Sequence, residues 1–228
     1  MPKIIRQFKL LIHPLTLFSL LALISFSFIY VDLALESELY NMNFRDSSII
    51  FRNLTQLGSG FIIIPFLLAT LWFRYVQVKP ILEQRAWFIS ACVIFTGAVC
   101  WGLKFFFGRS RPDLWHNSHE YGFYWLQIKS LYWSFPSGHA TTVLSATFAL
   151  CFLFPRYTAL LVITGFGIAL TRVVLGYHYL SDVIAASYFT LLEMSCFIYC
   201  LHKRGHLTHV LPQPESDQNT QATVSTPT

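Results

Sequence analysis

The sequence predicts an all-α, polytopic membrane protein in which six transmembrane helices form one bundle. Charged residues make up only 12% of the 228 residues, about half of the roughly 25% found in soluble domains, and hydrophobic residues make up 54%. The chain also contains 22 Phe and 6 Trp, and its mean hydropathy is +0.51. Apolar runs of spanning length alternate with short polar segments, which is the pattern of consecutive membrane spans.

The N-terminal half of the chain contains three of the predicted spans. Pro14–Val31 is an almost uncharged run that follows a basic N-terminus, a pattern that is also typical of a signal peptide. The run approaches the roughly 20 residues that a span requires, and no convincing cleavage site follows it, so we predict an uncleaved span. The second and third spans are expected at 59–73 and 86–103, with a polar connection at 32–58.

The C-terminal half contains the other three spans and one long segment that is not apolar. We predict the spans at 141–154, 158–174 and 183–201, and the long segment at 104–135. No internal repeat is present, so residues 1–206 are expected to form one domain. Residues 207–228 are rich in Gln, Thr, Pro and Ser, and we predict a disordered cytoplasmic tail there.

The distribution of basic residues predicts the topology of the six spans. The side with both termini carries nine of the sixteen Lys and Arg residues, and the opposite side carries seven. Four of those seven have another reason to be there, because they stand beside potential anion-binding residues; they are Lys104, Arg109, Arg111 and Arg172. Without these four, the positive-inside rule places both termini in the cytoplasm. The segments 32–58, 104–138 and 175–182 then face outward.

Charge and cysteine usage exclude several classes of partner. The net charge of +5 reflects membrane topology rather than nucleic-acid binding, because the basic residues are scattered and form no stripe. All five cysteines lie within apolar runs, and their spacing matches neither a zinc site nor a disulfide framework. We therefore expect no cofactor, no metal, no nucleic acid and no obligate protein partner.

Three groups of polar residues fall at the predicted outer ends of spans three to six. With x for any residue, they are Lys104-x6-Arg111-Pro112, Pro136-Ser137-Gly138-His139 and Arg172-x5-His178-x3-Asp182. The predicted topology brings all three groups to the same membrane surface, although they lie far apart in the chain.

The residue types in these groups suit the binding of a phosphate. Lys104, Arg111 and Arg172 supply positive charge, and each Arg can grip two oxygens at once. Ser137 and Gly138 begin an apolar run, which predicts a helix N-terminus with Ser137 near the cap. The free amides and the helix dipole at such a terminus favour an anion.

The two histidines would carry out the two remaining tasks, which are the attack on phosphorus and the transfer of a proton. Asp182 follows His178 by four residues, so its carboxylate would hold one ring nitrogen and leave the other free to attack phosphorus. His139, at the predicted helix start, would give a proton to the leaving oxygen. No carboxylates stand at metal-ligand spacing, so the three cations would neutralise the phosphate in place of a metal.

These groups resemble the signature of the type-2 phosphatidic-acid phosphatase superfamily, also called the haloperoxidase-like acid phosphatases, in its bacterial membrane lipid phosphatase branch. The family pattern is Lys-x6-Arg-Pro, Pro-Ser-Gly-His and Ser-Arg-x5-His-x3-Asp; the one departure here is Thr171 for Ser, which keeps a hydroxyl. The resemblance covers about 104–182 and implies a phosphohistidine on His178, oriented by Asp182, with His139 as the acid. It also implies a metal-free site and the phosphate ligands Lys104, Arg111, Ser137, Gly138 and Arg172.

The predicted protein is thus an integral membrane phosphatase of the bacterial cytoplasmic (inner) membrane, with its active site at the outer membrane-water interface, facing the periplasm or exterior. It would remove a phosphate from a membrane-embedded lipid phosphate or diphosphate. The resemblance implies undecaprenyl diphosphate, phosphatidylglycerol phosphate, phosphatidic acid and lipid A 1-phosphate as candidates. A lipid-to-lipid phosphotransferase that uses the same site and a non-catalytic membrane protein are the alternatives, whereas hydropathy excludes a soluble haloperoxidase.

Several residues near the three groups have two possible interpretations, one structural and one functional. Arg109 is either an accessory phosphate or headgroup contact or a solvated charge. Glu193 is expected to face the bundle or to lie near the inner interface. A polar loop is favoured over a metal site for Asp113, His116, His119 and Glu120. An interfacial belt, which would also shape a headgroup pocket, is expected from Trp115, Tyr121, Tyr124, Trp125, Tyr132 and Trp133.

Overall fold

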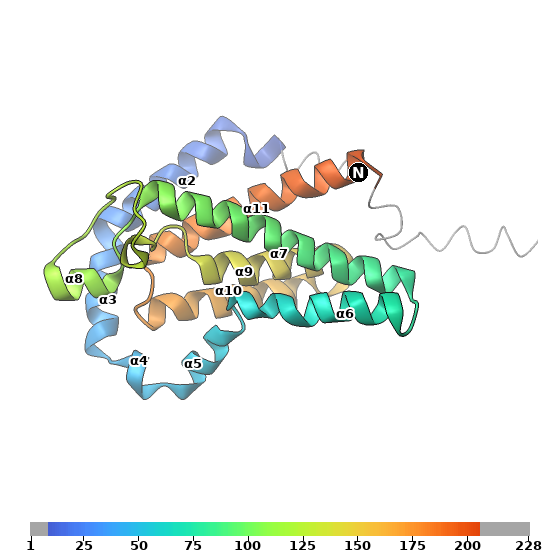
Figure 1. Ribbon diagram of the computed structural model, residues 1–228. Coiled ribbons are helices and arrows are strands. Elements are labelled where there is room, and N and C mark those ends of the chain that lie inside the picture. The colour runs from blue at the N-terminus through green and yellow to red at the C-terminus, as the bar shows by residue number, and fades with distance from the viewer. Residues whose placement is uncertain (1–8, 206–228) are drawn as a thin grey trace, which may run out of the picture.

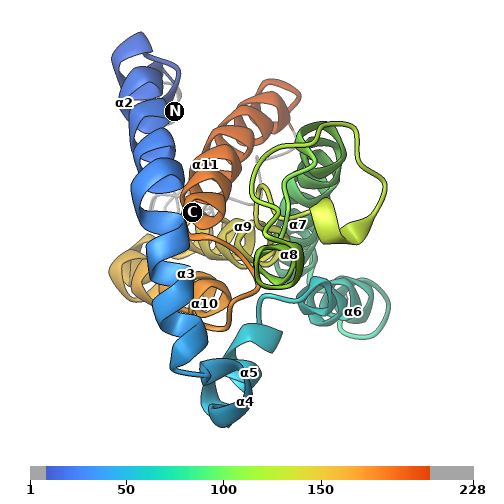
Figure 2. The ribbon, with the colours of Figure 1, turned by 90° about the vertical axis from the view of Figure 1, so that its left-hand side faces the viewer.

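The computed structural model describes residues 9–205, and this part of the chain is helical, as the sequence predicts (Figure 1). Long helices run side by side, and short helices gather at one end of the bundle (Figures 1 and 2). Within residues 9–205 the only β-type pairing is an isolated bridge between Arg109 and Phe123. The predicted domain boundary at 206 and the predicted tail lie outside the described residues.

The first helical segment is longer than predicted. α2 (Pro14–Phe26), a π-helical turn (Ser27–Val31) and α3 (Asp32–Asn41) form one run of 28 residues. The prediction of a polar connection from residue 32 was therefore wrong, because the helix continues to Asn41. The π-helical turn stands immediately before Asp32, whose side chain is buried. A buried carboxylate requires partners, and these come from distant parts of the chain.

The second candidate spanning segment is bent. α4 (Phe44–Ser47) and α5 (Ile49–Gln56) are followed by a 3-10 turn (Gly60–Ile62) and α6 (Ile63–Tyr75). The helical axis changes direction by 51° between α5 and the residues from Gly60 onward. Gly58 lies at this bend, where a Cβ would come within 3.2 Å of the His139 carbonyl oxygen. The bend therefore brings the end of α5 against the second motif group.

Four long helices follow, and α9 lies at their centre (Figure 2). They are α7 (Pro80–Phe107), α9 (Gly138–Leu153), α10 (Thr158–Val174) and α11 (Leu180–Lys203). α7 begins with a proline, whose missing N–H costs nothing at a first helical position. It ends at Gly108, which adopts the left-handed conformation (φ +56°) that glycine reaches without strain. α9 packs against α7, α10 and α11.

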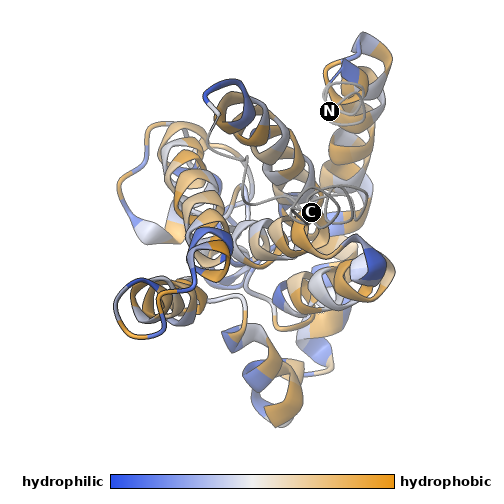
Figure 3. Cartoon of the chain, turned by 90° about the vertical axis from the view of Figure 1, so that its right-hand side faces the viewer, coloured by the Kyte–Doolittle hydropathy of each residue, from blue (hydrophilic) through white to orange (hydrophobic). Residues whose placement is uncertain are grey.

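Apolar side chains lie both in the centre of the bundle and along its outer faces. Phe88, Leu144 and Met194 are among the buried core residues. α9 and α10 approach so closely that a Cβ on Gly165 would overlap the Thr147 side chain. Large apolar side chains such as Phe18, Leu68 and Ile163 are exposed along the outer faces of the helices. Figure 3 shows hydrophobic colour along the helices and hydrophilic colour concentrated at their ends. This distribution suits a bilayer as the surrounding solvent.

Among residues 9–205, four helical runs are long and apolar enough to cross a membrane, or five if the bent pair counts as one span. The four are Pro14–Asn41, Pro80–Phe107, Pro155–Val174 and Leu180–Lys203. α9, predicted as the fourth span, has only 16 residues and does not reach this length. The described chain is thus an all-α membrane protein with four or five candidate spans by this criterion.

Candidate active site

The three motif groups meet at one end of the bundle, where α7 and α10 end and α9 and α11 begin (Figure 1). Lys104 reaches the second group, since a Cβ on Gly138 would lie 3.3 Å from Lys104 Cε. The amide of Ser137 donates to the carbonyl oxygen of Asp182 at 3.2 Å, which ties the second group to the third. Side chains from all three groups therefore share one small volume.

The second group forms the N-terminus of α9. Ser137 is the N-cap, as the sequence predicts, with extended backbone and a side chain that accepts from the Ala140 amide at 3.5 Å. The amides of Gly138 and His139 have no carbonyl acceptor within the helix, because they belong to its first turn, so they are available to an anion. The positive end of the dipole of α9 points the same way.

Within residues 9–205 the three predicted cations donate only to neutral groups. Lys104 Nζ donates to the Trp133 carbonyl oxygen at 2.6 Å. Arg111 Nε donates to the Ser130 carbonyl oxygen at 3.1 Å. Arg172 donates to Thr55 Oγ1 at 3.2 Å, and its guanidinium carbon lies 4.0 Å from the centre of the Tyr177 ring. These contacts aim the cations without neutralising them.

The cations also lack a direct ion-pair partner in the described part of the chain. Within residues 9–205, neither Lys104, Arg111 nor Arg172 forms an ion pair with a carboxylate, and no group accepts from Arg172 Nε. Lys104 and Arg172 are only 6% and 7% exposed. A buried charge without a partner is costly, and an anion bound here would relieve that cost.

His178 and Asp182 are held together by Ser134. His178 Nδ1 lies 3.5 Å from Asp182 Oδ2. The Ser134 hydroxyl donates to the same oxygen at 2.6 Å and lies 3.4 Å from His178 Nδ1. Nδ1 therefore faces the carboxylate, which leaves Nε2 as the ring nitrogen available to a substrate.

The surroundings keep His178 neutral. It lies in the turn between α10 and α11 and is only 2% exposed. Burial holds the pKa of the His178 imidazole well below its ordinary value; the hydrogen bond that the ring donates to Asp182 opposes this, and the positive charges of Lys104 and Arg111 reinforce it. A neutral imidazole has the free electron pair that a nucleophile requires.

His139 occupies the second position of α9 and is partly buried. Its carbonyl oxygen and Cβ lie 3.2 and 3.4 Å from the position of a Cβ on Gly58. The positive charges of Arg172, Lys104 and Arg111 all act on its ring. His139 on α9 and His178 in the turn between α10 and α11 thus border the same group of cations.

Both sequence-based interpretations of Arg109 were wrong, because the residue is fully buried and ion-paired. Its guanidinium donates to Asp182 Oδ1 at 2.5 Å and to Asp32 Oδ2 at 2.8 Å. It also donates to Ser181 Oγ at 2.6 Å. The Asp182 and Asp32 carboxylates, working against the effect of burial, raise the pKa of Arg109 above its ordinary value. Neither a phosphate nor solvent is needed to satisfy this charge.

The structure adds residues that the sequence analysis did not assign to the site. Asp32 accepts from Arg109 and from both the amide and the hydroxyl of Ser181. Ser134 and Thr55 anchor Asp182 and Arg172. The only sequence signal for Asp32 is a carboxylate directly after a long apolar run. Nothing in the sequence links Thr55 to an arginine that follows it by more than a hundred residues.

The polar residues of 113–120 have separate partners. α8 (Pro112–Ser118) presents Asp113 to Arg45 at 2.5 Å and His116 to Glu36 at 3.2 Å. Glu120 accepts from the Tyr132 hydroxyl at 2.7 Å. Within residues 9–205 no three His, Cys, Asp or Glu side chains are grouped closely enough to hold a metal ion.

The structure agrees only in part with the predicted aromatic belt and with the predicted position of Glu193. Tyr121, expected in an aromatic belt, instead points inward, donating to the Phe28 carbonyl oxygen and accepting from Arg109. Trp125 packs on Phe106 and Phe107 at the end of α7 and is half exposed, as a belt residue would be. Glu193 is partly buried, and within the described chain its Oε2 has no hydrogen-bond partner.

The family to which the chain belongs follows from a match of residues 85–206, more than half of the chain, to the model of the PAP2 superfamily. The chain is a PAP2 protein. The matched region contains all three motif groups and the helices α9, α10 and α11 that carry two of them. The resemblance inferred from the motifs is therefore confirmed.

Two curated PAP2 relatives are named lipid A 1-phosphatase. The protein from Rhizobium johnstonii is 39% identical over 112 residues, which are 47% of this chain and 46% of the relative. The protein from Rhizobium etli is 36% identical over 117 residues, 50% of each chain. The chain thus spans about half the length of the curated relatives that it matches.

Among solved structures, the PAP2 chain is similar to a transmembrane PAP2 type phosphatidylglycerolphosphate phosphatase from Bacillus subtilis. The comparison covers 88% of this chain and 92% of the other, with 14% identity and a TM-score of 0.43.

Proposed function

We propose that this PAP2 protein is an integral membrane phosphatase that hydrolyses a lipid phosphate through a phosphohistidine intermediate. One observation carries the proposal: the charges of Lys104, Arg111 and Arg172 converge on His139 at the N-terminus of α9, and within residues 9–205 none of the three forms an ion pair with a carboxylate. Arg109, by contrast, is fully paired with Asp32 and Asp182. A phosphate is the anion that fits three cations and a row of backbone amides.

In the proposed first step, His178 Nε2 attacks phosphorus while the three cations and the amides of Gly138 and His139 hold the other phosphate oxygens. A nitrogen–phosphorus bond forms and the bond from phosphorus to the lipid oxygen breaks. His139 gives its proton to that oxygen, which leaves as the alcohol of the lipid. Asp182 stabilises the positive charge that develops on the His178 ring.

In the second step, water attacks the phosphohistidine. His139, now neutral, accepts a proton from the water, an oxygen–phosphorus bond forms, and the nitrogen–phosphorus bond breaks. Inorganic phosphate leaves and His178 returns to its neutral state. The electrostatic contribution is the largest part of this mechanism, because the cations stabilise negative charge that builds up on the transferring group.

We infer that the substrate is a phosphomonoester of a membrane lipid, and lipid A 1-phosphate comes first among the candidates. The names of the two Rhizobium relatives support this order, and the relatives share 39% and 36% identity with the matched part of the chain. Phosphatidylglycerol phosphate, phosphatidic acid and undecaprenyl diphosphate are the lipids against which lipid A 1-phosphate should be compared.

We also propose six membrane crossings, with both termini in the cytoplasm and the active site facing outward. The bent pair formed by α5 and α6 would be the second crossing, and α9 the fourth. At 1.5 Å per residue the 16 residues of α9 extend about 24 Å, less than the roughly 30 Å of a hydrocarbon core. The enclosure of α9 by α7, α10 and α11 would allow it to be short and its N-terminus to lie below the membrane surface.

The proposal is tested with purified protein and a panel of the four lipids, with a second lipid added as a possible phosphoryl acceptor. We expect inorganic phosphate from at least one lipid, and a loss of at least about 1,000-fold in His178→Gln. His119→Gln, a change at an exposed histidine, is the matched control and should keep wild-type activity. A phosphorylated acceptor in place of inorganic phosphate would make the protein a transferase, and an active His178→Gln variant would refute the nucleophile.

A further inference from the structure

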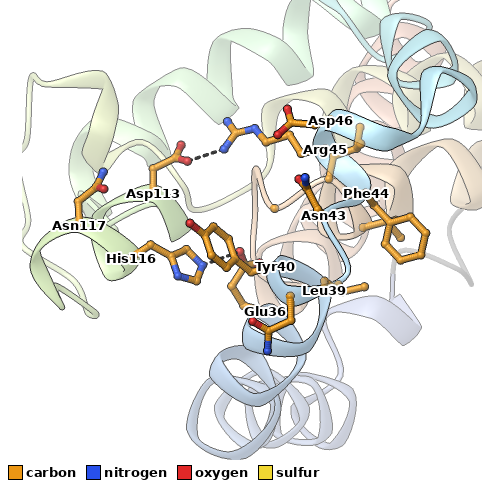
Figure 4. Close-up of a pocket in the computed structure, with 14 residues that line it drawn as sticks. Glu36, Leu39, Tyr40, Asn43, Phe44, Arg45, Asp46, Asp113, His116 and Asn117 are labelled. Atoms are coloured by element: carbon orange, nitrogen blue, oxygen red, sulfur yellow. Dashed lines mark hydrogen bonds and ion pairs between the residues drawn. The ribbon is translucent and has the colours of Figure 1, made fainter.

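A cavity lies beside the proposed phosphate site. It has a volume of about 740 Å³ and lies between α3, α4, α8 and the turn after α10 (Figure 4). This volume falls within the range of roughly 300–1,000 Å³ that is usual for small-molecule sites. Its side chains are mainly polar and include Glu36, Asn43, Arg45, Asp113 and His116.

The cavity shares walls with the phosphate site. Arg45 and Arg172 lie over the same Tyr177 ring, at 4.3 and 4.0 Å from its centre. Leu175 and Gly176, which line the cavity, belong to the turn that leads to His178. Asp113 follows the phosphate-site residue Arg111 by two positions. A molecule with its phosphate on the cations can therefore extend its polar part past Arg45 into the cavity.

Glu36 gives the cavity an unused hydrogen-bond acceptor. Its side chain is only 3% exposed, and Oε1 accepts from His116 Nε2 at 3.2 Å (Figure 4). Within residues 9–205 no group donates to Oε2, although this atom is buried. An unpartnered buried carboxylate oxygen is costly, so this atom calls for a donor from a ligand.

The charge of the lining indicates which ligand supplies that donor. Carboxylates outnumber cations, since Glu36, Asp46 and Asp113 line the cavity with Arg45, and Arg45 is already paired with Asp113. A second phosphate is disfavoured by this lining. Carboxylate and amide oxygens accept readily from hydroxyl groups, which a sugar ring presents on several sides.

We propose that this cavity binds the hydroxyl-bearing headgroup of the lipid whose phosphate occupies the neighbouring site, with Glu36 Oε2 accepting from a headgroup hydroxyl. The cavity is large enough for a ring of sugar size, which exceeds the glycerol of a simple phospholipid. This inference rests on the proposed phosphatase function and adds to it the part of the protein that selects among lipid phosphates.

Glu36→Gln is the sharpest test of this cavity. The amide oxygen of Gln can still accept from His116, so the substitution removes only the free acceptor and keeps the side-chain size. Glu38→Gln is the matched control, because Glu38 is an exposed carboxylate on the same helix and does not line the cavity. Asn117→Trp, at the exposed edge of the cavity, is a second variant that narrows the space and leaves Glu36 in place.

The variants are compared on lipid A 1-phosphate and on phosphatidic acid, whose phosphate carries no hydroxyl-bearing headgroup. We expect Glu36→Gln and Asn117→Trp to lower kcat/KM about tenfold on the first substrate and less than twofold on the second. Equal losses on both substrates, or no loss on lipid A 1-phosphate, would overturn the proposal.

A binding measurement separates this proposal from the phosphatase function. Dephosphorylated lipid A in detergent micelles is titrated against each variant by tryptophan fluorescence, which requires no turnover. The wild type and Glu38→Gln should bind it about tenfold more tightly than Glu36→Gln does. Equal affinities would refute the headgroup site even if the enzyme is active, and the expected difference would support the site even if phosphate release fails.

Discussion

At the residue scale, Arg109 joins two carboxylates from opposite parts of the chain. Its ion pairs with Asp32 and Asp182 are fully buried, so removing the guanidinium leaves two buried carboxylates without a counter-charge. We predict that Arg109→Met lowers the free energy of unfolding by about 3–5 kcal/mol. Denaturant unfolding in detergent measures this loss.

Arg52→Met is the control for that experiment, because Arg52 is exposed and forms no ion pair within the described residues. Its unfolding free energy should remain within about 0.5 kcal/mol of wild type. Wild-type stability in Arg109→Met would show that the buried network does not hold the fold together.

The pH dependence of activity is a second prediction at this scale, and it concerns His178. The nucleophile must be neutral, and its pKa in the folded protein lies well below the ordinary histidine value of about 6.5. Activity should therefore persist as the pH falls below 6.5 and disappear only as the pH passes the lowered pKa. The acidic limb of kcat/KM against pH measures this value in the free enzyme.

The variant Arg111→Ala tests the electrostatic cause of the lowered His178 pKa. The positive charge of Arg111 helps to lower the pKa of His178, so its removal should move the acidic limb toward higher pH, besides weakening phosphate binding. An acidic limb at or above 6.5 in the wild type would contradict the neutral, buried histidine.

At the element scale, the contact between α9 and α10 depends on one glycine. A Cβ on Gly165 would overlap the Thr147 side chain, whereas a Cβ on Gly167 has nothing within 4 Å. Gly165→Ala should therefore destabilise the protein by about 1–3 kcal/mol through overpacking. Gly167→Ala should be neutral or stabilising by up to about 1 kcal/mol, because alanine favours a helix. Thermal unfolding of the two variants compares them directly, and equal midpoints would disprove the close packing of these helices.

Some helices and caps could be predicted from sequence patterns alone. The predicted fifth span, 158–174, coincides with α10, and Ser137 caps α9 as predicted, because hydropathy and local capping chemistry define both. The first span was misjudged at its end. Polar residues after Val31 indicated a connection, but Asp32 and Glu36 are buried within a continuing helix. Their burial depends on Arg109 and on α8, which no local pattern could reveal.

At the scale of the whole molecule, the number of crossings determines where the termini lie. Five spans would place the termini on opposite sides of the membrane, and six would place them on the same side. We predict six, so reporter fusions after Arg85 and Lys203 should both report the cytoplasm, and a fusion after Asn117 should report the exterior. A fusion after Lys203 that reports the exterior would show that α9 does not cross the membrane.

The sequence by itself determined the membrane class, most helices and the three motif groups, because hydropathy, caps and spacing are local properties of the chain. It also determined which residues are chemically suited to binding a phosphate. Only the tertiary structure decided which of the charged residues form ion pairs. Arg109 and Arg111 stand two positions apart, yet Arg109 is neutralised by Asp32 and Asp182, and Arg111 is not. An ion pair depends on distance through space, and the fold alone brings residue 32 to residue 109 or sets the cavity around Glu36 beside the turn that carries His178.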